Sequence, residues 1–537
     1  MRNAATILSI IRERGKRGLP LEDVYRQLFN PDLYRLAYGK IYRNQGAMTP
    51  GATPETVDGM SLDKIQNIIG LLREERYRFS PARRTYIEKK NSTKKRPLGL
   101  PTWSDKLLQE VIRLLLEAYY DPQFSNHSHG FRHHRGCHSA LTEIERTWRG
   151  TAWFIEGDIK GCFDNLDHSI FLGILREKIR DNRFLRLIEN LLQAGYLEEW
   201  KYNATHSGSP QGGIVSPLLA NIYLDRLDRY VEEHLLPNFN RGNARRRNPE
   251  FESLNHRWHY LQRRGRIEEA KQLHRQVLTL PAKMTDDPDY RRLRYIRYAD
   301  DFLLGFAGPR HEAEEIKARL KEFLQDTLKL ELSETKTLIT HGRSQAARFL
   351  GYDLRVLHND TYRAKDGSRK TNGNIGLFVP AEVVRARCQR YMKGGKPSNR
   401  PELLRDSEYS ILLQYQYEYR GFANYYQLAV DRSRKLPRLK WVMETSLTQT
   451  LANKFRTKVT QVYRRFATTL ETEQGCYKVL QTKVEREGKA PLVATWGGIS
   501  LARVKDKKMV ILKDAIKPDY PFRTEIVTRL LNGERHL

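Results

Sequence analysis

The sequence predicts an α+β protein organised around a sheet that carries acidic residues. Residues 293–298 and 302–306 are rich in aromatic and branched side chains, which is typical of strands. Asp300 and Asp301 lie in the tight hairpin between them. Residues 153–158 form a further apolar strand that also ends in an acid, and long stretches with helical periodicity occur elsewhere in the chain.

Adjacent acids are a costly choice for a purely structural turn. At 4 Å, like charges repel by about 1 kcal/mol in water and about 4 kcal/mol near a low-dielectric surface. A cation is expected to offset this repulsion, and oxygen ligands suit Mg²⁺ or Mn²⁺. Asp158, Asp300 and Asp301 could converge on two ions about 4 Å apart, which would clamp the attacking and leaving oxygens of a phosphoryl transfer. The alternative is an exposed turn at 300–301 and a helix cap at Asp158, before a predicted helix near His168.

Two motifs resemble those of a known family. Tyr298-Ala299-Asp300-Asp301 is similar to the signature of reverse transcriptases, and Asp158 with Phe163 resembles their first metal-binding motif. From about Asp32 onward the chain resembles the group II intron-encoded reverse transcriptase/maturases. This resemblance implies that Asp158, Asp300 and Asp301 are catalytic. It also implies that these three residues, with Ile159, form the site of two Mg²⁺ ions, for which Mn²⁺ is the alternative.

The resemblance also implies the architecture. It is a right-hand polymerase, with fingers and an antiparallel palm sheet, followed by an α-helical thumb or X domain and a basic C-terminal DNA-binding segment. The expected parts are the N-terminal extension and fingers at 1–150, the palm at 151–365, the thumb/maturase X domain at 366–456 and the DNA-binding segment at 457–537. The palm contains a basic insert at about 238–292, and the reverse transcriptase domain spans about 60–355.

Composition favours a polyanionic partner. The 537 residues include 94 Lys and Arg against 64 Asp and Glu, a net charge of +30. Nucleic acid is the expected partner, rather than a membrane surface, because no run approaches the roughly 20 apolar residues of a membrane span. The four cysteines form no CxxC pair, which argues against structural zinc and fits a reducing compartment. The N-terminus is expected to be an ordinary helix, with an organelle presequence as the alternative, and the protein is expected to be cytoplasmic.

A hairpin of the fingers is predicted at 86–101, with a basic turn. Cations on such a hairpin can bind triphosphate oxygens and close over the substrate. By resemblance, Lys89 and Arg96 contact the triphosphate, although Lys90 could replace Lys89. A solvated charged turn is the alternative.

Three further residues are expected at the nucleotide. By resemblance, Phe163 lies under the incoming sugar and leaves no room for a 2′-hydroxyl, with core packing as its alternative. Gln211 belongs to a Pro-Gln-Gly-Gly loop that opens a helix, an arrangement that brings backbone N–H groups and an amide close to a ligand. By resemblance, that ligand is the incoming nucleotide. Lys336 lies near the active site by resemblance.

Residues 127–138 contain five histidines and Cys137. No carboxylate joins them in the sequence, so the segment is interpreted as a loop near the template strand and not as a metal site. In the palm insert, Arg245-Arg246-Arg247 is followed by a predicted helix at 251–278 with many further cations. An RNA-facing role and a solvated face are both open for this insert.

The pattern turns helical from Ile375, and an aromatic stripe there is interpreted mainly as core; its members are Tyr415, Tyr419, Phe422 and Tyr426. Residues 418–426 and 450–454 are similar to the thumb of maturases. The resemblance implies that Arg420, Asn424 and Lys454 contact RNA or the primer–template duplex. It also implies that Phe349 and Gly351, in Phe349-Leu350-Gly351, grip the primer strand.

The expected function is RNA-directed DNA synthesis combined with binding of a group II intron RNA, which promotes splicing and supports retrohoming by target-primed reverse transcription. The expected partners are the intron RNA in a ribonucleoprotein associated with a bacterial nucleoid, a DNA target or primer, and deoxynucleoside triphosphates; a homodimer is open. The alternative is an RNA-binding splicing maturase with an inactive polymerase site. Phe163 argues against an RNA-directed RNA polymerase. The Cys pairs of an endonuclease module are lacking, so nicking of the target strand by this polypeptide is not expected.

Overall fold

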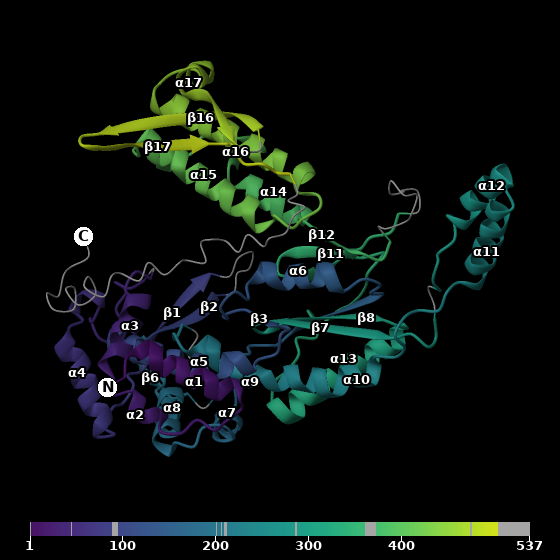
Figure 1. Ribbon diagram of the computed structural model, residues 1–537. Helices are drawn as coiled ribbons and strands as arrows, with labels where there is room; N and C mark the ends of the chain where they lie inside the picture. The colour runs from purple at the N-terminus through teal and green to yellow at the C-terminus, as the bar shows by residue number, and fades with distance from the viewer. Residues whose placement is uncertain are drawn as a thin grey trace.

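The computed structural model describes residues 2–44, 46–88, 95–199, 201–205, 207–208, 212–284, 287–359, 372–472 and 475–502 (Figure 1). Two of the predicted nucleotide-binding residues, Lys89 and Gln211, lie outside the described residues. So does 503–537, the end of the predicted DNA-binding segment.

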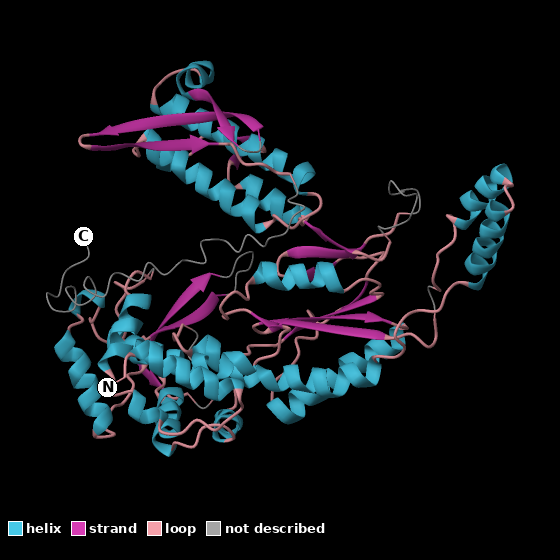
Figure 2. Cartoon of the chain, in the orientation of Figure 1, coloured by secondary structure: helices cyan, strands magenta, loops and turns pink. Residues whose placement is uncertain are grey.

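A five-stranded sheet forms the palm, with the strand order β3-β7-β8-β4-β9 (Figure 2). Its strands are β3 (Ser128–His129), β4 (Trp153–Asp158), β7 (Arg292–Tyr298), β8 (Asp301–Ala307) and β9 (Ile339–His341). The pairs β7–β8, β8–β4 and β4–β9 are antiparallel, and only β3 joins the sheet in parallel. The predicted acidic strands and the antiparallel palm sheet are thus present.

The palm sheet separates two hydrophobic cores. Side chains alternate between the faces of a strand. Tyr295 and Leu304 therefore pack into the core shared with the fingers, whereas Ile296 and Leu303 pack into the core shared with the thumb. Helix α6 (Cys137–Thr147) lies on the thumb side of the sheet, and helices α9, α10 and α13 lie on the opposite side (Figure 1). The bounds of the latter are α9 (Ser216–Tyr230), continued by a π-helical turn (Val231–Leu235), α10 (Leu236–Phe239) and α13 (Arg310–Leu328).

The N-terminal region and fingers are mainly helical, as predicted for the first 40 residues. The helices are α1 (Ala4–Lys16), α2 (Val24–Gln27), α3 (Pro31–Ile41), α4 (Leu62–Arg73), α5 (Trp103–Tyr120), α7 (His168–Arg176) and α8 (Asn182–Gln193), with short 3₁₀ turns at Val57–Gly59 and Asp121–Gln123. A sheet of order β2-β1-β5-β6 carries the fingers hairpin. Its strands are β1 (Ala82–Glu88), β2 (Lys95–Leu100), β5 (Tyr196–Glu198) and β6 (Lys201–Asn203).

The palm insert forms a helical hairpin that extends away from the sheet (Figure 1). The prediction of one helix over 251–278 is wrong, because the structure has α11 (Pro249–Arg263) and α12 (Ile267–Val277). Gly265 breaks the helix by adopting a positive φ of 74°, which is favourable only for glycine. The ring of Trp258 stacks on that of His274 and holds the two helices together.

A small antiparallel sheet, β10-β11-β12, connects the palm to the thumb. It comprises β10 (Ala347–Phe349), β11 (Tyr352–Val356) and β12 (Ile375–Phe378). The expected helical pattern from Ile375 is therefore wrong at its start, because Ile375–Phe378 pairs with β11 and the first helix begins at Ala381. Ile375 and Leu377 are both buried, and this buried position favours pairing over a helix.

The thumb consists of helices covered on one side by a three-stranded sheet (Figure 2). Its elements are α14 (Ala381–Gln389), β13 (Met392–Lys393), β14 (Lys396–Pro397), a 3₁₀ turn (Pro401–Leu403), α15 (Glu408–Tyr425), α16 (Arg432–Lys454), α17 (Val459–Phe466), β15 (Ala467–Thr472), β16 (Gly475–Arg486) and β17 (Lys489–Trp496). Trp496 of β17 is buried against Tyr415 and Tyr419 of α15, so these two tyrosines are core residues, as predicted. Among the described helices, none has the length and apolar character needed to cross a membrane.

Candidate active site

The acidic hairpin is a two-residue turn between paired strands. Tyr298 pairs with Asp301, which leaves Ala299 and Asp300 at the tip. Ala299 has a positive φ of 54°, a conformation that residues with a Cβ rarely adopt. Such a tight turn fixes the directions of the two carboxylates that follow Ala299.

Asp158 lies directly opposite Asp301 in the neighbouring strand. The two residues are register partners of the antiparallel pair β4–β8, and such partners have Cα atoms about 4.5–5.5 Å apart. The sheet therefore brings together acids that are more than 140 positions apart in the sequence.

The carboxyl groups disfavour one another's ionisation. Burial, followed by the charges of Asp300 and Asp158, raises the pKa of Asp301 to about 7. Burial also raises the pKa of Asp300, with a contribution from Asp158, while Arg96 and Lys336 act in the opposite direction. Carboxylates whose pKa values are raised in this way favour a nearby cation.

A lysine supplies positive charge in this structure. Lys336 Nζ donates hydrogen bonds to both carboxylate oxygens of Asp158, at 3.0 and 2.9 Å. The segment that carries Lys336 is held beside β4, because the backbone N–H of Ser333 donates to the carbonyl of Asp158. The hydrogen bond to Asp158 raises the pKa of Lys336.

The donor set is compatible with a hard divalent cation. Asp158, Asp300 and Asp301 offer only oxygen ligands, and their repulsion would be relieved by an ion. Ile159 has a buried apolar side chain, so it could contribute only its backbone carbonyl. Across the described ranges, no three His, Cys, Asp or Glu side chains are already arranged as a metal site, these three acids included, and Lys336 occupies both oxygens of Asp158. Holding an ion together would therefore require the carboxylates to reorient.

Three of the five predicted nucleotide-binding residues are described. Arg96 is exposed on β2 of the fingers hairpin, and its charge acts against the rise that burial causes in the pKa of Asp300. Phe163 is half-buried in the turn after β4 and packs against the core shared with the fingers. Lys336 lies on Asp158. The structure thus places Lys336 against Asp158 and Phe163 in the turn after β4, and the roles of all three residues at a nucleotide stay a prediction.

The loop that precedes Gln211 is attached to the turn that follows Phe163. Gly208 N–H donates to Leu166 O at 2.8 Å, and His168 Nε2 donates to Gly208 O at 2.7 Å. Gly208 has a φ of 86°, and a Cβ there would lie 2.6 Å from Asp164 O. Only glycine allows this close approach of the two segments.

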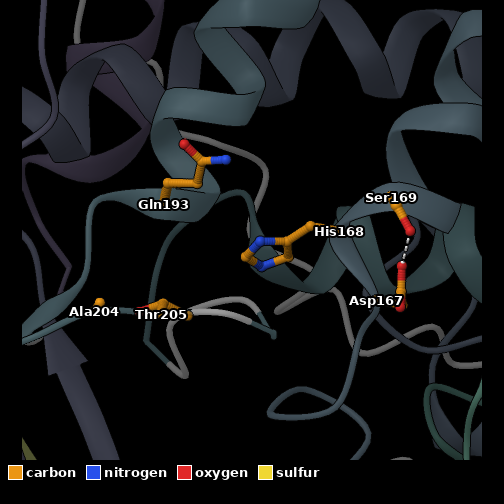
Figure 3. Close-up of a pocket in the computed structure, with 6 residues that line it drawn as sticks. All are labelled: Asp167, His168, Ser169, Gln193, Ala204 and Thr205. Carbon is orange, nitrogen blue, oxygen red and sulfur yellow. Dashed lines mark hydrogen bonds between the residues drawn. The ribbon is translucent and has the colours of Figure 1, made fainter.

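A surface pocket of about 440 Å³ lies next to this attachment (Figure 3). Asp167, His168 and Ser169 line it from the start of α7, together with Gln193, Ala204 and Thr205. None of the three acidic residues of the palm lines it. The pocket is therefore separate from the candidate active site.

The predicted RNA- and primer-binding residues differ in their accessibility. Arg420 is exposed on α15, with its guanidinium 4.9 Å from the ring centre of Tyr417, and Asn424 is half-exposed one turn further on. Lys454 Nζ donates to Leu404 O at 3.1 Å, so its ammonium is used within the thumb.

Phe349, one of the two residues expected to grip the primer, is only 4% exposed, and its side chain belongs to the core. Gly351 occupies a turn with a φ of 71°.

The histidine-rich loop at 127–138 differs in one contact from what the sequence predicted. A carboxylate does join two of its histidines: Glu143 of α6 contacts His127 Nδ1, and its other oxygen lies 3.2 Å from His129 Nε2. These contacts lower the pKa of Glu143 to about 2. The local sequence pattern contains no sign of this contact, because Glu143 comes from the helix after the loop.

Arg297 is an important residue that none of the sequence motifs singled out. It is fully buried and pairs with Asp228 of α9 through Nε and Nη2. Its Nη1 donates to the carbonyl of Ala299 at 2.8 Å and to Asn221 Oδ1 at 3.0 Å. The sequence did contain a sign that Arg297 is buried. It follows Leu293 and Tyr295 at every second position, so it lies on the same inward face of the strand.

Comparison with known proteins adds evidence on ancestry. Residues 87–354 match the family described as reverse transcriptase (RNA-dependent DNA polymerase), and residues 383–495 match the family described as type II intron maturase. The group II intron-encoded protein LtrA of Lactococcus lactis subsp. cremoris is 42% identical over 463 residues, which cover 82% of this chain and 76% of that protein. The putative COX1/OXI3 intron 1 protein of Saccharomyces cerevisiae is 32% identical over 445 residues, which cover 80% of this chain and 53% of that protein.

A solved structure of telomerase from Candida albicans, in complex with a fragment of telomeric RNA, also aligns with this chain. The TM-score is 0.34 at 12% identity, with 72% of this chain and 62% of that chain covered. A likeness at this level carries no argument about function.

Proposed function

The chain belongs to the group II intron-encoded reverse transcriptase/maturase family, and from this premise we propose which of its residues carry out DNA synthesis. The expected family, fold class and enzyme class are confirmed, so the protein is an RNA-directed DNA polymerase that also has a maturase region. Reverse transcriptases use divalent metal ions. Mg²⁺ as the ion, and each residue role below, belong to the proposal.

Asp158, Asp300 and Asp301 are proposed to hold Mg²⁺. The single observation that supports this best is the cross-strand pairing of Asp158 with Asp301 beside Asp300. Bound ions would supply Lewis acidity and neutralise charge as the primer 3′-hydroxyl attacks the α-phosphorus of a deoxynucleotide and pyrophosphate leaves. Ions bound to Asp158 would displace the ammonium of Lys336 from this carboxylate, and the ammonium could then turn toward the substrate.

The remaining residues bind and orient the nucleotide. Arg96, with Lys89, is proposed to bind the triphosphate oxygens from the fingers hairpin. Phe163 is proposed to exclude the 2′-hydroxyl, and Gln211 to lie beside the incoming base and sugar. The support for a shared site is the attachment of the Gln211 loop to the turn that carries Phe163, through Gly208 and His168.

Contact with nucleic acid is proposed for one face of α15. Tyr417, Arg420, Gly421 and Asn424 recur at helical spacing, and the first three are exposed. Tyr417 is 54% exposed although it is aromatic, and a Cβ at Gly421 would meet no neighbour within 4 Å. A face of this kind can approach a nucleic-acid backbone closely while offering a cation and an amide. The predicted domain boundaries also stay part of the proposal. The one at 456 would separate α16 from a segment whose Trp496 packs on α15, and the maturase match extends past it to residue 495.

The maturase function is proposed to stabilise the folded intron RNA by binding it. A protein that binds only the folded RNA shifts the folding equilibrium by mass action. The resulting ribonucleoprotein would promote splicing and then use deoxynucleoside triphosphates to copy the intron RNA at a DNA target, in the cytoplasm. One or two copies of the chain could be present in this particle, since a homodimer is open.

Primer extension tests the polymerase proposal. Asp300→Asn should abolish Mg²⁺-dependent cDNA synthesis on an RNA template while largely sparing binding of the intron RNA. Asp326→Asn, at an exposed position of α13, is the matched control and should retain synthesis. If the wild-type protein binds the intron RNA and incorporates no nucleotide, it is a splicing maturase with an inactive polymerase site. Loss of RNA binding together with synthesis in Asp300→Asn would contradict separable functions.

A further inference from the structure

A strained turn connects the palm to the thumb. Phe349 of β10 pairs with Tyr352 of β11, so Leu350 and Gly351 form a two-residue turn. Leu350 has a φ of 45° and Gly351 a φ of 71°. A leucine in this conformation costs free energy, and such a conformation persists only where surrounding contacts hold it in place.

Two tyrosines of the thumb make those contacts. Tyr425, the last residue of α15, donates from its hydroxyl to Leu350 O at 2.8 Å. The hydroxyl of the next residue, Tyr426, donates to Gly351 O at 3.1 Å. Both carbonyls of the turn are therefore bound by the end of one helix from another part of the fold.

The contact is reciprocal, which makes it rigid. Tyr352, immediately after the turn, donates from its hydroxyl to the carbonyl of Tyr425. His138 of α6 also donates to this carbonyl from Nε2, at 2.7 Å. The turn and the end of α15 thus fix one another, and α6 of the palm is joined to both.

The same tyrosine packs into the core that the catalytic hairpin shares with the thumb. Tyr298 of the hairpin, Leu350 of the turn and Tyr425 are all partly buried against this core. Tyr298 immediately precedes the tip of the hairpin that carries Asp300 and Asp301. Tyr425 is therefore hydrogen-bonded to the turn and to α6, and it shares a core with the catalytic hairpin.

We propose that Tyr425 and Tyr426 are positioning residues that set the place of the primer strand relative to the catalytic carboxylates. This inference rests on the proposed DNA synthesis and on the expectation from the sequence that the 349–351 turn contacts the primer. The hydroxyls hold the turn in its strained conformation, so a displacement of α15 moves the turn with it. Nucleic acid bound on the thumb would in this way influence the alignment of the primer 3′-end.

The thumb provides a matched control for this idea. Tyr415 is on the same helix and is fully buried, and its hydroxyl hydrogen bonds with Ser446 Oγ at 2.8 Å, within the thumb. Tyr415→Phe therefore removes a buried hydrogen bond of the same chemistry that does not reach the palm. Any effect that it shares with Tyr425→Phe and Tyr426→Phe is a general effect of stability.

The experiment compares full-length wild type, Tyr425→Phe, Tyr426→Phe, the double variant and Tyr415→Phe. Single-turnover extension of a DNA primer on an RNA template should be slower by about three- to tenfold for each hydroxyl removed at 425 or 426. The KM for the deoxynucleotide should stay unchanged, because the triphosphate contacts lie on the fingers. Tyr415→Phe should lower the melting temperature similarly and leave the extension rate unchanged.

Amide hydrogen exchange gives a readout that does not need catalysis. Exchange at 349–352 should be faster in the double variant than in the wild type, and unchanged in Tyr415→Phe. A double variant that matches Tyr415→Phe in both extension rate and exchange would overturn the positioning role. A wild-type protein without any extension would instead refute the proposed function, while the exchange data would still decide whether the hydroxyls hold the turn.

Discussion

The ammonium of Lys336 lies 2.9 Å from Oδ2 and 3.0 Å from Oδ1 of Asp158, on the carboxylate proposed to bind metal. A lysine and a divalent ion compete for the same oxygens. Lys336→Met should therefore raise the affinity for Mn²⁺ in the absence of nucleotide, measured by electron paramagnetic resonance. It should also lower the metal-free melting temperature, by an amount that corresponds to about 1 kcal/mol or less, because Lys336 is well exposed.

Lys321→Met is the control for this prediction. Lys321 pairs with Glu334 at 2.8 Å near the same segment but does not contact the palm acids. It should leave Mn²⁺ affinity unchanged. Equal Mn²⁺ affinity in wild type and Lys336→Met would show that the lysine does not occupy the ion position.

The stability of the metal-free protein should fall as the pH rises from about 4 to about 7. The pKa of Asp301 is raised to about 7 and that of Asp300 is also raised, so in this window the folded protein binds more protons than the unfolded chain. The Asp301 contribution is fully present below the ordinary pKa and is lost as the pH passes the raised value. Its size is up to about 4 kcal/mol, at about 1.4 kcal/mol per pKa unit.

Melting temperatures in EDTA at pH 5 and pH 8 measure this effect. Asp301→Asn should reduce the difference between the two pH values, and added Mg²⁺ should reduce it in the wild type. Asp326→Asn should keep the wild-type difference. An unchanged difference in Asp301→Asn would mean that the carboxyl ionises without cost in the folded protein.

Phe163→Ala should relax the choice of sugar. The half-buried ring is proposed to exclude the 2′-hydroxyl, so its removal should raise the ratio of ribonucleotide to deoxynucleotide incorporation by about 10- to 100-fold. Phe323→Ala is the control, because Phe323 is also partly buried against the same core but stacks on Tyr230 of α9. A ratio that does not change in Phe163→Ala would leave the ring with a packing role alone.

Arg297→Met should destabilise the protein by about 3–5 kcal/mol, because it leaves the fully buried Asp228 without its partner. Melting curves should show a large loss, and the double variant Arg297→Met with Asp228→Asn should recover part of it. Arg294→Met is the control on the same strand. Arg294 is only half-buried and donates to Arg149 O, so its loss should cost much less. Similar melting temperatures for the two single variants would contradict the importance of the buried pair.

The helical insert can be removed without breaking the palm. Asn248 N–H donates to Ala282 O at 3.1 Å, so a short Gly/Ser linker can replace residues 249–281. Primer extension on an unrelated template should be retained, because α11 and α12 lie away from the sheet. Intron RNA affinity should fall, and the slope of log K against log salt should become less negative by about 0.7–0.9 for each RNA phosphate that the insert no longer neutralises. An identical slope would identify the insert as a solvated face.

The acids could be predicted from the sequence because strands carry local signals. Asp158 ends an apolar strand, Asp301 begins another and Asp300 lies in the turn before it, and acids at such positions are conspicuous. Arg297 was visible as a charged residue at an inward position, but its partner Asp228 comes from a distant helix. Long-range pairing of this kind depends on the tertiary fold, which no local pattern contains.

The thumb also has features that local sequence patterns could not predict. Residues 467–496 form a sheet, although the composition of this region indicated only a basic and mixed segment. The turn at Gly488, with a φ of 64° between β16 and β17, was a local hint of a hairpin. The burial of Trp496 on α15 decides the arrangement, and it depends on a helix some 70 residues earlier. The hydroxyl contacts of Tyr425 and Tyr426 were hidden for the same reason, because an aromatic stripe predicts burial and not which backbone atoms it touches.

The two short bridges at the base of the insert, Arg241 with Arg291 and Arg247 with Lys283, have a consequence for engineering. They bring the two ends of the insert together at one place, so the helices between them are joined to the polymerase only through this base. Doubling the length of such an excursion costs only about 0.6 kcal/mol of closure entropy. A different RNA-binding domain could therefore be inserted at the base of the insert. Such a domain would change which RNA templates the polymerase selects, without a fusion to either end of the chain.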